Sequence, residues 1–218
     1  MLAPATIALA VTWFLCHSLG VHILAPILGS HEVGGSPRWR SAVGLITSCF
    51  ALPSLMGLGL YHAGSFSHWC NAVVVEGLGP YDWAFVLVFA GLMLVDLAQG
   101  TMLTALLKVH HVTCLCGHAY ACLYAVAGFP YYFAGVASLE LGSAATGVHA
   151  LWPRSFPSSA LVACMTLSNL SAVYCCSLWH LEHVVPFPAG ARVSSAIIVL
   201  LAFMRQKDAM EVHAAASK

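Results

Sequence analysis

Three histidines lie close together in a chain that is otherwise mostly apolar. The stretch "LLKVHHVTCLCGH", residues 106–118, contains the adjacent pair His110 and His111, and His118 follows seven residues later. An imidazole titrates near neutral pH, so it can take a proton from an amine or accept an acyl group itself. We therefore treat this stretch as the first candidate for a binding or catalytic site.

Two carboxylic acids lie deep inside apolar segments. The stretches "LMLVDLAQG" and "ASLELGSAATG" contain Asp96 and Glu140. An ionisable side chain in such a segment is costly and usually faces a cavity or a partner. A carboxylate beside a histidine can orient the imidazole and stabilise its cation. The two acids are therefore candidate partners of the histidines.

The spacing of these residues predicts that they share helix faces. Three sets recur at helical intervals: Asp96, Gln99 and Gly100; His111, Cys114 and His118; Glu140, Ser143, Ala144 and Gly147. Residues three, four or seven apart lie on one face of an α-helix. We expect the three faces to meet in one interior pocket. The alternative is a purely structural hydrogen-bond network, because helices in membranes also pack through small and polar residues.

The elements that position these residues are predicted to be membrane-spanning helices. Of the 218 residues, 60% are hydrophobic and 7% are charged, whereas a soluble domain carries about 25% charged residues. The chain has too few charged side chains to cover a water-facing surface, so we expect an all-α, multi-pass transmembrane helix bundle. The formal net charge of +0 argues against a nucleic-acid-binding protein.

The apolar segments predict about seven spans, or six if the last segment does not cross. They lie at residues 2–28, 41–61, 82–106, 110–129, 131–151, 159–180 and 189–204. With seven spans, all basic residues except Arg192 fall on one side. Basic residues favour the cytosolic side, so we expect a lumenal N-terminus and a cytosolic C-terminus.

The order of the polar residues resembles the TLC-domain family, which includes ceramide synthases, translocon-associated membrane proteins and lipid-regulating membrane proteins. The resemblance rests on "PRWRSAVGLITS" at the second span, an acid in the third, "HHVT" opening the fourth and "ELGSA" in the fifth. It implies that His110 and His111 are the family's histidine pair, Asp96 the preceding acid and Glu140 the following one. Where ceramide synthases have two aspartates three residues apart, this chain has Glu140 and Ser143.

The resemblance also implies a domain organisation and a location. It predicts a first transmembrane helix and loop at 1–34, a TLC-like transmembrane domain at 35–205 and a short cytosolic tail at 206–218. The endoplasmic reticulum is the membrane that the family implies.

Two functions fit these residues. The first is binding or regulation of membrane lipids, in homeostasis, sensing or trafficking, through a cytosol-facing cavity of histidines and acids. Its lipid-binding residues are expected to be His111, His118, Asp96, Gln99, Glu140 and Ser143. The second is N-acyl transfer of the ceramide synthase type, from acyl-CoA to a long-chain amine, with His110, His111 and Asp96 as catalytic residues. We favour the first, because Ser143 leaves one carboxyl fewer.

Neither function calls for a cofactor or a metal ion, and the expected partner is a membrane lipid rather than nucleic acid. A minor alternative is a haem or metal protein. His111 and His118 share one helix face, and His17 or His149 could lie opposite them, so that histidines on facing helices would hold the group. All three alternatives use the same short stretch of the chain.

Overall fold

The computed structural model describes residues 15, 18–29, 32–33, 36–98, 105–124, 126–182 and 188–217, and they are almost entirely helical. The elements in chain order are η1 (Leu19–Leu24), α2 (Ala25–Leu28), β1 (Glu32–Val33), β2 (Ser36–Pro37), α3 (Arg38–Ile46), η2 (Thr47–Ala51), α4 (Leu52–Ala63), α5 (Phe66–Glu76), α6 (Pro80–Ala98), α7 (Ala105–Tyr124), η3 (Val126–Gly128), α8 (Phe129–Leu151), α9 (Ser158–Glu182) and α10 (Pro188–Ala216). The two short strands pair antiparallel.

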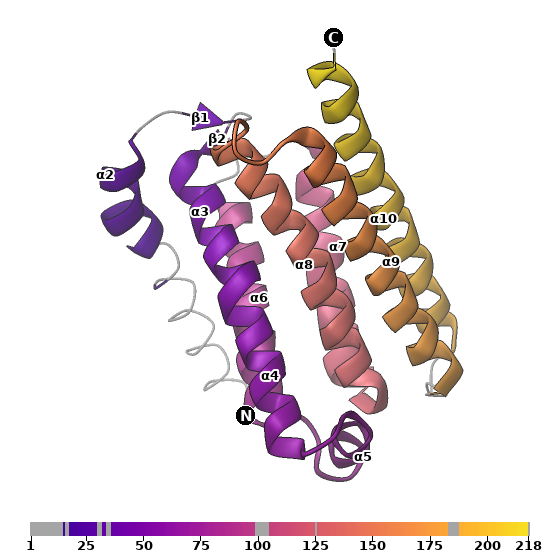
Figure 1. Ribbon diagram of the computed structural model, residues 1–218. Coiled ribbons are helices and arrows are strands. Elements are labelled where there is room, and N and C mark those ends of the chain that lie inside the picture. Colours follow the sequence, from indigo (N-terminus) through magenta and orange to yellow (C-terminus); the bar gives the residue numbers. More distant parts are fainter. Residues whose placement is uncertain are drawn as a thin grey trace.

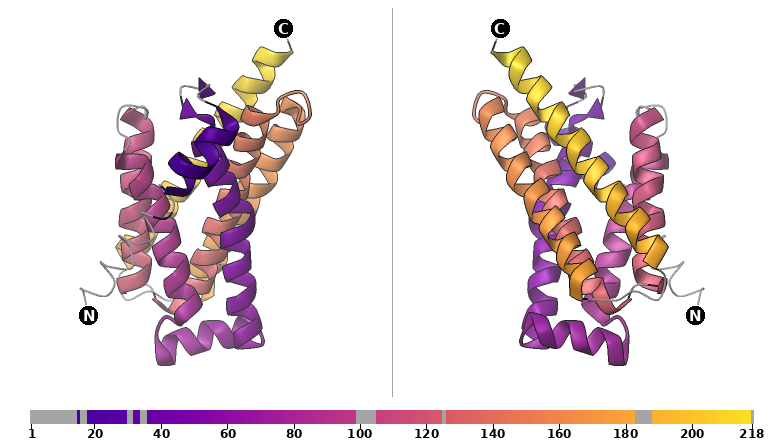
Figure 2. Two further views of the ribbon diagram at one scale, coloured as in Figure 1. Left: turned by 90° about the vertical axis from the view of Figure 1, so that its left-hand side faces the viewer. Right: turned by 90° about the vertical axis from the view of Figure 1, so that its right-hand side faces the viewer.

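The long helices pack side by side and run in alternating directions (Figure 1). The segments α3, η2 and α4 form one continuous helix, and it ends at Gly64, whose φ of 76° is left-handed. Glycine suits this helix end because it has no Cβ to clash in that conformation. Helix α5 then lies across the end of the bundle (Figure 2). The C-terminus lies at the opposite end.

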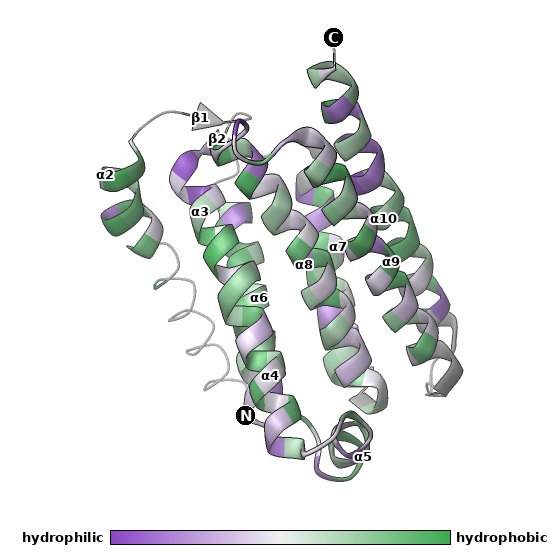
Figure 3. Cartoon of the chain, in the orientation of Figure 1, coloured by the Kyte–Doolittle hydropathy of each residue, from purple (hydrophilic) through white to green (hydrophobic). Residues whose placement is uncertain are grey.

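Three helices among the described residues are long and apolar enough to cross a membrane: Arg38–Ala63, Pro80–Ala98 and Ser158–Trp179. Apolar residues recur along the long helices (Figure 3), and many large apolar side chains are exposed on the outside of the bundle. Leu167 and Phe203, for example, are 69% and 68% exposed. A water-soluble bundle would carry charged side chains on such faces. The chain is therefore a helical membrane protein.

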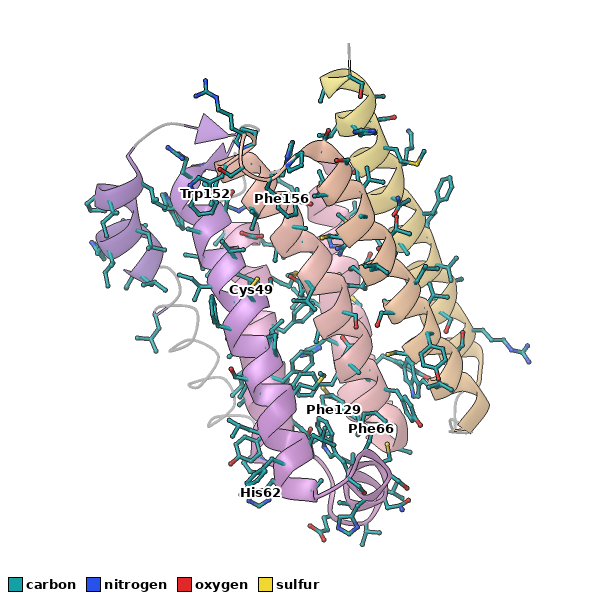
Figure 4. The ribbon with its side chains drawn as sticks, in the orientation of Figure 1. Cys49, His62, Phe66, Phe129, Trp152 and Phe156 are labelled. Atoms are coloured by element: carbon teal, nitrogen blue, oxygen red, sulfur yellow. The ribbon has the colours of Figure 1, made fainter. Side chains whose placement is uncertain are left out.

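The core near α5 is aromatic. Phe85 and Phe133 are completely buried and stack with ring centroids 3.7 Å apart. Phe129 meets Phe85 edge-on at 6.1 Å, and Phe66 and Phe129 lie together at this end of the bundle (Figure 4). Offset and edge-to-face ring pairs add to the packing energy of a core. This cluster packs α5, α6 and α8 together at one end of the bundle.

The helices agree with most of the expected spans. The helix α3–α4 and helices α8 and α9 begin and end within three residues of the expected bounds. Helix α7, at Ala105–Tyr124, begins and ends five residues before the expected span 110–129, and helix α6 is described as far as Ala98, with residues 99–104 outside the described ranges. Most of the expected first span, 2–28, lies outside the described residues. The total of about seven spans therefore stays a prediction.

Two further segments, both expected to lack helical structure, contain helix. The long connection between the second and third spans contains α5, because Trp69 and Val73 are buried against the aromatic core. The segment 206–218, expected as a short tail, instead continues α10 to Ala216. The buried residues Ala202 and Ala209 lie seven apart, so one face of α10 remains packed beyond the expected end of the span.

Candidate functional site

A network of polar side chains links α3, α6 and α7 near the end of the bundle that carries the C-terminus. Arg40 Nε donates to Asp96 Oδ1 over 2.6 Å, and Asp96 Oδ2 lies 2.8 Å from His111 Nε2. These side chains are 14%, 13% and 5% exposed, respectively. The spacing of the polar residues predicts that Asp96 and His111 meet, and they do. Arg40 was missed, since its sequence context marked it only as a basic residue of a loop.

The second acid, Glu140, lies buried in the middle of α8. Ser48 Oγ of η2 donates to Glu140 Oε2 over 3.0 Å. Arg205, His111 and Asp96 are close enough for their charges to interact with the Glu140 carboxyl. The structure therefore brings both predicted acids and His111 into one polar region. Ser48 was missed because a lone serine in an apolar helix is too common to stand out.

Arg205 of α10 reaches into the bundle, although the sequence analysis placed it beyond the last span. Its guanidinium donates to the Leu139 carbonyl oxygen and lies 3.5 Å from Met165 Sδ. Gly142 makes room for it, because a Cβ at that position would lie 2.6 Å from Arg205 Nη2. The guanidinium also interacts with the Glu140 charge. This longer-range attraction partly offsets the cost of burying the two charges.

An elongated cavity of about 560 Å³ lies between α7, α8, α9 and α10. In Figure 2, α7 diverges from α9 toward the end that carries the C-terminus, and α10 crosses between them. Most of the lining is apolar and includes Phe89, Val136, Leu139, Ala172, Trp179, Val193, Ile197, Ile198 and Leu201. His110, Glu140 and Arg205 also line the cavity.

The polar residues lie at one end of this cavity. The lining runs along α8 from Tyr131 to Glu140 and along α10 from Val193 to Arg205. At the rise of an α-helix these stretches correspond to a length of about 15 Å. Glu140 and Arg205 are the last lining residues of these two stretches, at the end of the bundle that carries the C-terminus. The cavity is therefore a long apolar chamber with one charged end.

The other predicted site residues do not line this chamber. Among the described residues, Asp96, His111 and the half-buried Ser143 lie outside the lining. Asp96 and His111 instead form the neighbouring network with Arg40. Gln99 lies outside the described residues.

His118, predicted to bind lipid, has a structural position instead. It is 3% exposed. Its Nε2 lies 3.1 Å from the Val86 carbonyl oxygen, and its Nδ1 lies 2.9 Å from Tyr132 Oη. A carbonyl oxygen can only accept, so Nε2 carries the proton and Nδ1 accepts from the tyrosine hydroxyl. Both ring nitrogens are used, which leaves none for a ligand.

We expect His118→Ala to weaken the fold without reducing lipid binding. The change leaves the Val86 carbonyl and the Tyr132 hydroxyl without this partner, which costs about 2 kcal/mol. Thermal unfolding in detergent should show the loss, while the amount of lipid per folded molecule, measured by native mass spectrometry, stays unchanged. Loss of lipid at unchanged stability would instead support the binding role.

The geometry offers no support for the haem or metal alternative. Within the described ranges, no three histidine, cysteine or acidic residues are arranged to hold a metal ion. His149 Nδ1 lies 2.7 Å from the Phe156 carbonyl oxygen, at the turn between α8 and α9. His17 lies outside the described residues.

The chain matches no protein-family model, no curated protein and no solved structure. The resemblance to the TLC-domain family therefore rests on the quoted stretches alone. We infer the function from the geometry of the cavity and of its charged end.

Proposed function

We propose that this membrane protein binds a membrane lipid in the cavity between α7 and α10. The acyl chain lies along the apolar chamber, and the polar head lies against His110, Glu140 and Arg205. The observation that carries the proposal is the shape of the cavity, which is long and apolar with charged groups at one end. Ligand sites of this kind are mostly apolar, with a few polar groups that orient the ligand.

The volume favours one acyl chain. A methylene group fills roughly the volume of a water molecule in the liquid, about 30 Å³. The 560 Å³ cavity then has room for one long acyl chain rather than two. A lipid with two chains would have to leave one of them outside, in the bilayer.

The charged end suits a head group that both donates and accepts hydrogen bonds. Arg205 supplies donors only, the Glu140 carboxylate supplies acceptors, and the His110 imidazole supplies either, depending on its protonation. Hydroxyl, amine and phosphate groups all fit such a set. The same end of the bundle contains Arg40 and Lys108, in keeping with the bias of basic residues toward the cytosol.

We extend the proposal to topology and family. The chain crosses the membrane about seven times, with its N-terminus in the lumen and its C-terminus in the cytosol. It is a TLC-like protein of the endoplasmic reticulum that regulates, senses or traffics lipids. The alternating directions of the helices (Figure 1) and the position of Arg40 and Lys108, near the starts of α3 and α7, support this proposal.

N-acyl transfer from acyl-CoA is the second candidate function. The observation in its favour is that His110 lines the charged end of the cavity, beside a histidine held by an acid. The His110 and His111 rings are 5.4 Å apart, and His111 in turn contacts Asp96. In this mechanism His110 takes the proton of the amine, and the neighbouring Asp96–His111 pair places a carboxylate near the imidazolium that forms.

Filling the cavity tests the lipid proposal. Ile198→Trp places a large ring inside the cavity, whereas Val199→Trp places the same ring on a face that is 52% exposed. We expect native mass spectrometry to find at least about tenfold less lipid on Ile198→Trp, which corresponds to about 1.4 kcal/mol. Val199→Trp should retain the lipid of the parent.

Thermal unfolding of both variants checks that the comparison is between folded proteins. Equal lipid content in the two folded variants would show that the bound lipid does not occupy this cavity, and the proposed function would then be wrong.

A further inference from the structure

A thiol and an imidazole lie within hydrogen-bond distance in the cavity. Cys114 Sγ is 3.6 Å from His110 Nε2, and both side chains line the same space. They are four residues apart on α7, so the helix itself holds them on one face. A thiol beside a base is the usual arrangement of an activated nucleophile. Neither proposed role of the cavity uses the Cys114 thiol.

We propose that Cys114 accepts the acyl group of a long-chain acyl thioester such as acyl-CoA, with His110 as the base. The inference rests on the proposed function, because the acyl chain then occupies the lipid cavity. The product is an S-acyl cysteine whose chain lies along the apolar lining. Here the acyl group becomes covalently attached to Cys114, whereas the lipid proposal by itself requires only reversible binding.

The step is a thiol–thioester exchange, and it balances without an oxidant or a reductant. Cys114 Sγ bonds to the carbonyl carbon of the thioester, and the thiol proton passes to His110 Nε2. The carbon–sulfur bond to coenzyme A then breaks. The departing thiolate takes the proton from His110 and leaves as coenzyme A. One thioester replaces another, so the reaction is near equilibrium and reversible.

The charged end of the cavity can support the transition state. The Arg205 charge is close enough to act on Cys114, and Thr113 lines the cavity beside it. A fixed cation near the carbonyl stabilises the oxyanion that develops during attack, most strongly where water is excluded. Arg205 is held in position by its hydrogen bond to the Leu139 carbonyl oxygen.

Two other cysteines that line the cavity lack this arrangement. Cys176 Sγ lies 3.1 Å from Ser195 Oγ on α10. Cys116 is exposed on its helix, and of the cavity cysteines only Cys114 has a described hydrogen bond to a histidine. Cys116 thus serves as a matched control for uncatalysed exchange with a thioester.

The test is intact-protein mass spectrometry of the purified full chain after incubation with palmitoyl-CoA at neutral pH. We expect one added palmitoyl group that neutral hydroxylamine removes and that peptide mapping assigns to Cys114. Cys114→Ala should remove it, and Cys116→Ala should keep it. His110→Gln should slow the acylation at least about tenfold, as loss of a general base does.

Other outcomes would overturn the inference. An acyl group that persists in Cys114→Ala would point to His110 or to another cysteine. Equal rates at Cys114 and Cys116 would indicate spontaneous exchange. Cys114→Ser retains the size of the side chain, so acylation of that variant that hydroxylamine removes would also place the thioester elsewhere.

The same samples separate this inference from the lipid proposal. Parent protein that carries co-purified lipid but takes no acyl group would overturn S-acylation and leave the lipid cavity intact. Parent protein with neither lipid nor acyl group would overturn both.

Discussion

Replacement of Asp96 by alanine is expected to lower the free energy of unfolding by about 3–5 kcal/mol, as removal of one partner from a buried ion pair typically does. Asp96 accepts from both Arg40 and His111, and its side chain is 13% exposed. Its loss removes the carboxylate that balances the Arg40 guanidinium in the Arg40–Asp96 ion pair. The measurement is an SDS titration of the detergent-solubilised protein, followed by circular dichroism.

The matched control breaks an ion pair that is exposed. Lys207 and Glu211 lie four residues apart on α10 and are 64% and 65% exposed. Glu211→Ala should therefore change stability by about 0.5 kcal/mol or less. Similar losses in the two variants would mean that Asp96 does not hold α3, α6 and α7 together.

Gly128→Ala should be as damaging as a large core deletion, although it adds a single methyl group. A Cβ on Gly128 would overlap the indole ring of Trp179, which is 2% exposed. Gly128 lies where η3 meets α8, so either the indole or the start of the helix must shift. Overpacking of this kind costs about 1–3 kcal/mol and occasionally more, and the degree of overlap places this site at the upper end. Thermal unfolding measures the loss.

Gly117→Ala is the control, and its expected effect on stability has the opposite sign. It lies inside α7, and a Cβ there would have no atom within 4 Å. Alanine is favoured over glycine within a helix by about 0.5–1 kcal/mol. The same substitution should therefore stabilise the protein at residue 117 and destabilise it at residue 128. Equal effects at the two sites would contradict the close approach of α8 to Trp179.

The two buried acids have different surroundings, and this divides the polar residues into two groups. Asp96 lies between Arg40 and His111, away from the cavity lining. Glu140 lies in the lining, with His110 and Arg205. The first group joins three helices, and the second faces the space that we propose a lipid occupies. In the proposed binding mode, His111 therefore belongs to the network that joins the helices, and His110 contacts the ligand.

The sequence by itself determined that this is a helical membrane protein, and it located most of the helices. Helix formation and membrane insertion depend on local apolar length and on helical spacing, which can be read from a single segment. The sequence also predicted that Asp96 and His111 meet. Two polar groups inside apolar helices are costly alone, and each has few possible partners.

The tertiary structure decided which polar side chains face the cavity. That choice depends on how each helix is rotated and how far α7 diverges from α9, which spacing within one helix does not encode. His118 lies seven residues after His111 and so shares its helix face, as a ligand-binding residue would. Tyr132 and Val86 nevertheless occupy both of its ring nitrogens. Arg205 follows an apolar segment and resembles the start of a tail, yet α10 continues past it. It enters the bundle because Gly142 leaves space for its guanidinium and Glu140 balances its charge.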